Sequence, residues 1–302
     1  MEHCVCEPKS WPGPNLSNGE LRHGTCGKPL ACACGTTALN IGVNGPECRR
    51  CSPVFSDAFF DESFDLERGF FDSFIYYAGG HRITDLLTHS PDFGNADYYF
   101  AGEKVIVELK ILKTEFASTP THLKKFGRLV AEWSADGRLD PEARLGLKPL
   151  PEAFVRQHLH IIRDQLEGIT KKANQQIKET KARLDLNDSQ GLLLVLNDGF
   201  YQANPNLTLA LIGDPLTRQM RSIDGYVLLN LRKKLKIPGD QWERFFWLPK
   251  YRVSENVTLS EFVNKLGASW FQYLEELSGR TFGSKVSSHD PDYKELTEGT
   301  YR

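Results

Sequence analysis

The sequence predicts a mixed α/β (α+β) fold, in which a mixed β-sheet is flanked by helices and preceded by a small cysteine-rich module. Two observations predict the sheet. Short apolar runs alternate with segments of helical repeat, and the run 191–199 is apolar enough for a strand covered on both faces. A third observation predicts the module, because all 7 cysteines lie within the first 51 residues.

The length and composition of the chain limit the size of its hydrophobic core, and its net charge limits how it could bind nucleic acid. The chain has 302 residues with 40% apolar content, enough for one sizeable core and a small appended module. Its formal net charge of -2 excludes a broadly basic surface, so nucleic acid would have to meet local patches. Two basic segments, 171–183 and 232–236, fit that role, although a solvated helix face or strand-end loop explains each equally well.

The sequence has no apolar run of membrane-spanning length, and its start lacks the apolar segment of a secretory signal. We therefore expect a cytoplasmic protein with no membrane partner.

The cysteines predict a structural zinc module over residues 1–52. An odd number of thiols without a secretory signal argues for metal ligands and against a disulfide framework. Zinc accepts sulfur and nitrogen ligands in a tetrahedron. The first predicted site comprises Cys32, Cys34, Cys48 and Cys51, and the second Cys4, Cys6, Cys26 and His23. The alternatives are a single site, or a Gly/Pro-rich leader with incidental thiols.

Residues 53–302 form the predicted second domain, and a helix opens it. Ser56 or Asp57 caps this helix and Gly79–Gly80 end it. The helix has an apolar stripe at spacings of three and four, made of Phe60, Phe64, Phe71, Phe74 and Ala78. Glu67 lies on the same stripe. A charge there is costly unless it is paired or binds a metal, so Glu67 is a candidate site residue; the alternative is that it reaches water from the edge of the stripe.

The remaining elements follow in a regular order. A hairpin over 95–112 precedes a helical insertion at about 115–168, a long helix at about 164–185 and the strand at 191–199. Residues 207–213 fit a helix or a strand. Two further strands are expected within 222–231 and 244–253, and an amphipathic helix over 258–279 closes the fold.

The hairpin carries the predicted chemistry. With residues 101–104 as a four-residue loop, Phe100 faces Val105, and the same register places Asp97 opposite Glu108, with Lys110 on their face. Two like charges about 4 Å apart repel by on the order of 4 kcal/mol at an effective dielectric near 20. A divalent cation offsets this repulsion, so the pattern predicts a magnesium site. The alternative is an exposed hairpin with an incidental ion pair.

The predicted ligands are Asp97, Glu108 and the carbonyl of Leu109, with Glu67 completing the site. A magnesium ion beside a lysine suits phosphodiester hydrolysis, because the ion polarises a phosphoryl oxygen and acidifies a water molecule. Lys110 would hold that water or neutralise charge that develops on the phosphoryl oxygens.

An acid followed across a hairpin by E-x-K, here Asp97 and Glu108-Leu109-Lys110, resembles the PD-(D/E)xK superfamily of restriction-endonuclease-like nucleases. The resemblance covers about residues 57–200. It implies a restriction-endonuclease-like sheet, two acids that bind Mg²⁺ or Mn²⁺ and a catalytic lysine. It also implies roles for Glu67 on the first helix and for a glutamine on the later helix, which Gln176 matches. The family motif has a proline before the first acid, whereas here the Pro-Asp pair is Pro91–Asp92.

The resulting hypothesis is a metal-dependent nuclease that hydrolyses phosphodiester bonds of nucleic acid, with DNA favoured over RNA, in defence or DNA processing. The zinc module would grip DNA or a protein partner, and a homodimer is compatible with the sequence. The alternative is a non-catalytic module of the same fold that binds nucleic acid or protein through its zinc unit. A zinc-centred enzyme is a third interpretation, but we find no general base near the cysteines.

Overall fold

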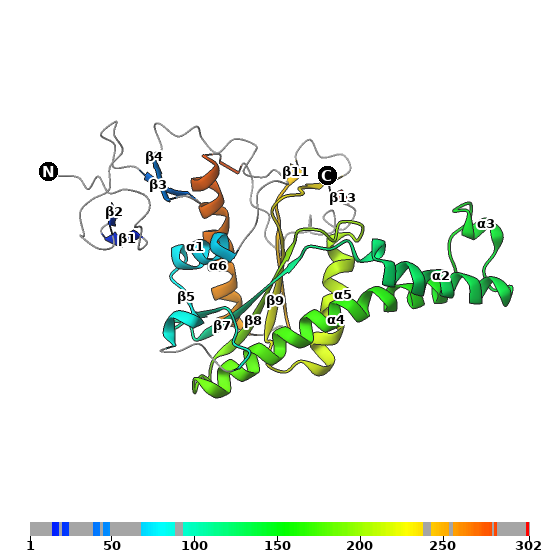
Figure 1. The fold of residues 1–302 in the computed structure, drawn as a ribbon, viewed down its shortest axis with the longest axis horizontal. Helices are drawn as coiled ribbons and strands as arrows, with labels where there is room; N and C mark the ends of the chain where they lie inside the picture. Colours follow the sequence, from blue (N-terminus) through cyan, green and yellow to red (C-terminus); the bar gives the residue numbers. More distant parts are fainter. Residues whose placement is uncertain are drawn as a thin grey trace. The chain divides into compact units, whose positions relative to one another are not determined.

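The computed structural model describes ten stretches of the chain: residues 14–17, 20–23, 39–42, 45–48, 68–87, 93–237, 243–253, 256–279, 281–282 and 300–301. These residues belong to two compact units, one of residues 1–78 and 268–283 and the other of residues 79–267 and 284–302. Figure 1 traces the elements of both units along the chain.

The first stretches are two antiparallel strand pairs. β1 (Pro14–Ser17) pairs with β2 (Glu20–His23), and β3 (Leu39–Gly42) pairs with β4 (Gly45–Cys48). Only their backbones are described. The predicted zinc ligands, the boundary at residue 52 and Glu67 therefore lie outside the described side chains, and their roles stay predictions.

The first unit also holds α1 (Arg68–Tyr77) and the end of α6 (Val257–Ser278). Phe71 and Phe74 of the predicted apolar stripe are fully buried, as expected. The ring of Trp270 stacks on Phe71 with a centroid separation of 5.4 Å and meets the edge of Phe74 at 5.0 Å. α1 ends where Gly79 adopts a φ of +88°, which confirms the predicted glycine stop.

A six-stranded mixed sheet forms the centre of the second unit (Figure 1). Its strand order is β12-β9-β8-β7-β6-β5. Their bounds are β5 (His81–Arg82), β6 (Tyr98–Phe100), β7 (Val105–Leu112), β8 (Gln190–Asn197), β9 (Gly225–Asn230) and β12 (Trp247–Tyr251). β7, β8 and β9 run parallel, and the other neighbouring pairs are antiparallel.

Helices cover both faces of this sheet. α4 (Glu152–Arg183) and α5 (Pro205–Gln219) share one core with the β7, β8 and β9 side chains that face them. The start of α6 lies on the opposite face, where Phe262 packs against Phe100 with a centroid separation of 4.9 Å. Leu192 to Leu196 of β8 are at most 2% exposed, which confirms a strand covered on both sides.

Short elements complete the second unit. A three-stranded sheet joins β10 (Leu235–Lys236) to β11 (Glu243–Arg244) and β13 (Thr300–Tyr301). The 3₁₀ turns η3 (Ile83–Leu86) and η4 (Phe116–Ser118) follow β5 and β7. Residues 207–213 lie within α5, so the ambiguous segment is a helix. The mixed sheet flanked by helices is thus as predicted.

The expected start of the long helix near residue 164 is wrong. α4 is one helix of 32 residues that begins at Glu152, so residue 168, the expected end of the insertion, lies inside it. The prolines that could have stopped a helix precede Glu152, and Gly168 sits on an exposed face of α4, where a glycine costs only about 1 kcal/mol.

α2 (Pro120–Ala135) and α3 (Pro141–Arg144) pack beside the first half of α4 as a helical arm, which extends away from the sheet in Figure 1. The arm has its own small core, in which Trp133 meets Phe154 edge-on at 5.5 Å.

A pair of histidines joins α2 to α4 at the base of the arm. The Nε2 atoms of His122 and His158 lie 3.2 Å apart, and His122 is only 2% exposed. Burial lowers the pKa of both rings. Among nearby charges, Glu115 raises the pKa of His122 and Lys125 lowers it, while His122 itself lowers the pKa of His158. Both rings are therefore neutral at pH 7, so a single N–H can bridge them.

We expect the arm to lose stability as the pH falls below about 6.5, the ordinary histidine value. Below that pH the unfolded chain takes up protons before the folded chain does, because the folded pKa values are lowered, so the free energy of unfolding decreases as the pH falls. The measurement is amide hydrogen exchange in residues 120–135 at pH 7.5 and 5.5, corrected for intrinsic exchange. His158→Gln should weaken the pH dependence, and His160→Gln, an exposed neighbour on α4, should keep it. Equal pH dependence in the two variants would contradict the role of the pair.

Candidate active site

The β6–β7 hairpin has the loop that the sequence predicts. Tyr98 pairs with Val107, Tyr99 with Ile106 and Phe100 with Val105, which leaves residues 101–104 as the turn. Lys104 closes the turn with a φ of +54°, in the left-handed region that tight hairpin loops use. The predicted register of the hairpin is therefore confirmed.

The pairing of β6 with β7 stops one residue before Asp97, so the expected cross-strand pair of Asp97 and Glu108 is not part of the ladder. Instead, the Asp97 side chain binds the backbone of β7: its Oδ2 atom accepts a hydrogen bond of 2.9 Å from the backbone N–H of Leu109. The Asp97 carbonyl accepts from the N–H of Ile83 at 2.9 Å. Asp97 thus keeps its place beside β7 through a side-chain hydrogen bond.

Glu108 and Lys110 lie on the face of β7 that α4 covers. They alternate along the strand with residues of the other face, and their neighbours on this face, Ile106 and Leu112, belong to the core shared with α4. Glu108 is 0% exposed and the Lys110 side chain is 16% exposed. The Lys110 ammonium donates to Oε1 of Glu108. A buried carboxylate is costly unless it is paired and hydrogen-bonded, and this ammonium supplies the pairing.

Gln176 of α4 connects the lysine to the segment before Asp97. Its Oε1 atom accepts from the Lys110 ammonium at 2.8 Å, and its Nε2 atom donates to the carbonyl of Asn95 at 2.9 Å. One amide therefore fixes both Lys110 and the backbone that leads into Asp97. The structure brings four of the predicted site residues together: Asp97, Glu108, Lys110 and Gln176.

The cluster offers oxygen donors of the kind that Mg²⁺ and Mn²⁺ prefer. Its described ligand candidates are two carboxylates, with no thiolate or imidazole among them. No group of three or more His, Cys, Asp and Glu side chains suited to a metal occurs in the part of the chain that the structure describes. Two carboxylates still fit magnesium, which usually keeps several waters and binds through one or two carboxylates and substrate phosphates.

Other predicted features of the site remain untested by this geometry. Pro91–Asp92 and Glu67 lie outside the described residues. The N–H of Leu109 binds Asp97, whereas the predicted role of its carbonyl as a ligand stays a prediction.

Sequence reasoning missed the residues that hold the segment before Asp97. Gly94 donates its N–H to Oε2 of Glu179 at 2.9 Å, and Ala96 donates its N–H to Oγ1 of Thr180 at 2.8 Å. The spacing of Gln176, Glu179 and Thr180 places them on one side of a helix, but nothing in the sequence says which segment that side meets.

No family model, no curated protein and no solved structure matches the chain. Its function is therefore inferred from the residues of the site.

We expect Lys110→Met to destabilise the fold by about 3 to 5 kcal/mol, the usual cost of removing one partner of a buried ion pair. Glu108 would then keep a buried charge without its ammonium. The double variant Glu108→Gln/Lys110→Met should recover part of this loss because it removes both charges. Urea denaturation checks both changes.

Lys104→Met is the matched control, because Lys104 pairs with Asp188 on the surface, where both side chains are 61% exposed. This variant should change the stability little. A Lys110→Met protein as stable as the control would show that the Lys110 ammonium does not stabilise the buried Glu108 carboxylate.

Proposed function

We propose that the chain is a nuclease that hydrolyses phosphodiester bonds with the help of Mg²⁺ or Mn²⁺ and acts on DNA rather than RNA. One observation carries this proposal: Lys110 binds both a buried glutamate and the amide of Gln176, and Asp97 is fixed to the same stretch of strand. An incidental ion pair on a surface hairpin would not require the acid, Glu108, to be fully buried. Nor would it require a residue of a helix, Gln176 of α4, to orient the lysine.

Each side chain has a role in this proposal. Asp97 and Glu108 hold the divalent ion, which supplies positive charge at a phosphoryl oxygen and acidifies a water molecule when bound. Lys110 brings a compact positive charge to the phosphoryl group, where negative charge increases during hydrolysis. Gln176 keeps the ammonium in place through its 2.8 Å hydrogen bond. This division of roles extends the resemblance to the PD-(D/E)xK nucleases.

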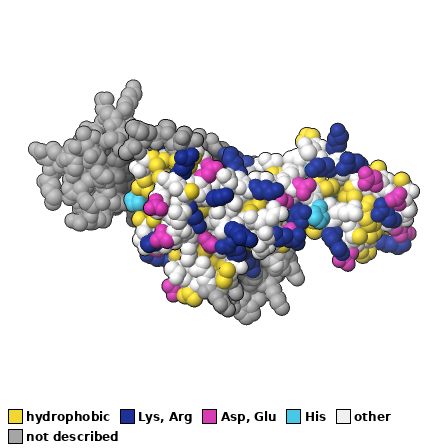
Figure 2. All heavy atoms as spheres, turned by 90° about the horizontal axis from the view of Figure 1, so that it is seen from below, with side chains coloured by type: hydrophobic (Ala, Val, Ile, Leu, Met, Phe, Trp, Pro, Cys, Tyr) yellow, Lys and Arg dark blue, Asp and Glu magenta, His cyan; other side chains and the backbone are white. Residues whose placement is uncertain are grey.

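The basic segment 171–183 of α4 supports contact with a nucleic-acid backbone only in part. Lys171 pairs with Glu167 at 2.6 Å, and Lys181 pairs with Asp224 at 3.6 Å. Lys172 and Lys178 are exposed. Figure 2 shows Lys and Arg side chains interspersed with acidic and apolar ones over the visible face. Phosphate contacts through these lysines would be salt-sensitive and independent of base sequence.

The second basic segment, 232–236, also makes internal contacts. Arg232 lies 3.4 Å from Asp198, and the ammonium groups of Lys233 and Lys234 lie 6.0 Å and 5.8 Å from the ring centroids of Tyr201 and Phe245. Lysines beside aromatic rings suit the backbone and bases of a nucleic acid, which supports this class of partner.

No helix among the described residues has both the length and the apolar character needed to cross a lipid bilayer.

We expect the protein to nick supercoiled plasmid DNA in the presence of Mg²⁺ or Mn²⁺. Asp97→Asn, Glu108→Gln and Lys110→Met should each lower the rate by at least about 100-fold, the scale on which loss of one group that stabilises transition-state charge is felt. Gel electrophoresis of the plasmid measures the rate. Asp188→Asn, which changes an exposed acid of the neighbouring surface pair, should cleave like the unchanged protein.

The competing function is a non-catalytic module of the same fold that binds nucleic acid or protein through the cysteine-rich region. It predicts that plasmid and RNA stay intact with every divalent ion while binding persists. Cleavage that survives in Asp97→Asn and Glu108→Gln would instead trace the activity to a contaminant or to another site, and would refute the assignment.

A further inference from the structure

The segment before Asp97 is held by side chains of α4. The backbone of Gly94, Asn95 and Ala96 makes one hydrogen bond each to this helix: the N–H of Gly94 to Glu179, the carbonyl of Asn95 to Gln176 and the N–H of Ala96 to Thr180. None of the three residues belongs to a strand or helix. The side chains of Gln176, Glu179 and Thr180 therefore supply the backbone hydrogen bonds that a neighbouring strand would supply in a sheet.

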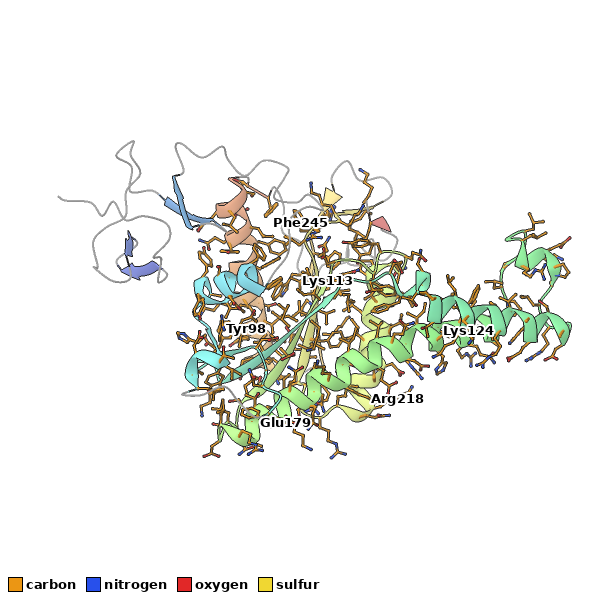
Figure 3. All side chains as sticks on the ribbon, in the orientation of Figure 1. Tyr98, Lys113, Lys124, Glu179, Arg218 and Phe245 are labelled. Atoms are coloured by element: carbon orange, nitrogen blue, oxygen red, sulfur yellow. The ribbon has the colours of Figure 1, made fainter. Side chains whose placement is uncertain are left out.

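The fit between segment and helix extends over four consecutive residues. Gln176, Glu179 and Thr180 are spaced i, i+3 and i+4, so they share one side of α4. Arg183, one turn further along the helix, places its guanidinium 5.8 Å from the ring centroid of Phe93. Glu179 near the end of α4 and Tyr98 at the start of β6 are both labelled in Figure 3. The arrangement thus fixes the chain up to the residue before Asp97.

Glu179 acts as an anchor for this segment. Its Oε2 atom accepts the N–H of Gly94 at 2.9 Å, and its Oε1 atom accepts from Nε2 of Gln175 at 2.6 Å. Both oxygens therefore accept hydrogen bonds from protein groups, which supports a role for Glu179 in holding this segment. A Cβ atom on Gly94 would lie 3.3 Å from Oε2 of Glu179, so the glycine lets the carboxylate approach closely.

Thr180 holds the residue next to Asp97 in a dry environment. Thr180 and Ala96 are both 0% exposed, and their hydrogen bond is 2.8 Å long. Without the hydroxyl group, the N–H of Ala96 would lose its partner where water does not reach, and a buried donor left unsatisfied is costly. The backbone of Ala96 leads directly into Asp97, so any shift of Ala96 displaces the carboxylate.

We propose that Thr180 and Glu179 are positioning residues of the metal site, which set the place of the Asp97 carboxylate relative to Glu108 through the backbone of residues 94–96. This inference rests on the proposed function and deepens it. Neither residue touches the reacting atoms; each acts through Asp97.

The test is the binding of Mn²⁺ to the full chain, measured from the electron paramagnetic resonance signal of the unbound ion. Mn²⁺ prefers oxygen donors to thiolates, so the cysteine-rich region contributes little to this signal. Thr180→Val keeps the shape of the side chain but removes the hydroxyl. It should raise the Kd for Mn²⁺ about three- to tenfold, the effect of losing one hydrogen bond that positions a ligand. Thr180→Ser restores the hydroxyl and should restore the Kd.

Thr170→Val is the matched control. Thr170 is also on α4 and is only 1% exposed, but its hydroxyl binds the carbonyls of Leu166 and Glu167 in its own helix. This variant removes a buried hydroxyl from the same helix without touching residues 94–96, so its Kd for Mn²⁺ should equal that of the unchanged protein. A loss of stability alone would affect both threonine variants.

Glu179→Ala provides a second variant on a less buried residue, and it should also raise the Kd. Circular dichroism confirms that each variant is folded. If Thr180→Val and Glu179→Ala bind Mn²⁺ as tightly as Thr170→Val, while Asp97→Asn does not bind it, the positioning role is refuted and the proposed function stands. If the unchanged protein binds no Mn²⁺, the metal site fails, and the proposed function and this inference fall together.

Discussion

The burial of the Glu108 carboxylate is the constraint on which the site depends. A fully buried charge needs a partner, and Lys110, two residues along the same strand, supplies it from the same face. The ammonium is itself mostly buried and makes a second hydrogen bond to Gln176. The hydrogen bond from Lys110 to Gln176 ties the ammonium to α4, and the same helix brings Glu179 and Thr180 to the segment before Asp97.

One continuous helix carries the arm and the site. The first half of α4 packs with α2 in a separate small core and supplies His158 to the histidine pair, whereas its second half contacts β7 and residues 94–96. Because α4 is one continuous helix, a rotation about its axis in the arm would also turn the side chains that face the site. The packing of the arm and the geometry of the site are therefore linked.

Part of this arrangement could be predicted from the sequence because it is local. The hairpin register follows from a four-residue loop and from alternation, so these two patterns alone assign Glu108 and Lys110 to one face of the strand. They do not predict the contact between Asp97 and Leu109, because the ladder ends at Tyr98 and a side chain replaces the missing strand. The sequence also does not predict where α4 begins. Gly168 and the change of helical pattern near it are compatible with a helix boundary and with one continuous helix.

The sequence by itself determined the mixed sheet with its helices, the hairpin and the four candidate side chains, because periodicity and turn chemistry act over neighbouring residues. Only the tertiary structure decided that Gln176 reaches Lys110 and that Glu179 and Thr180 hold Gly94 and Ala96. These contacts join residues more than 60 positions apart, and their geometry depends on how a whole helix packs against a sheet. That packing is set by the summed burial of many side chains, which a local pattern does not encode.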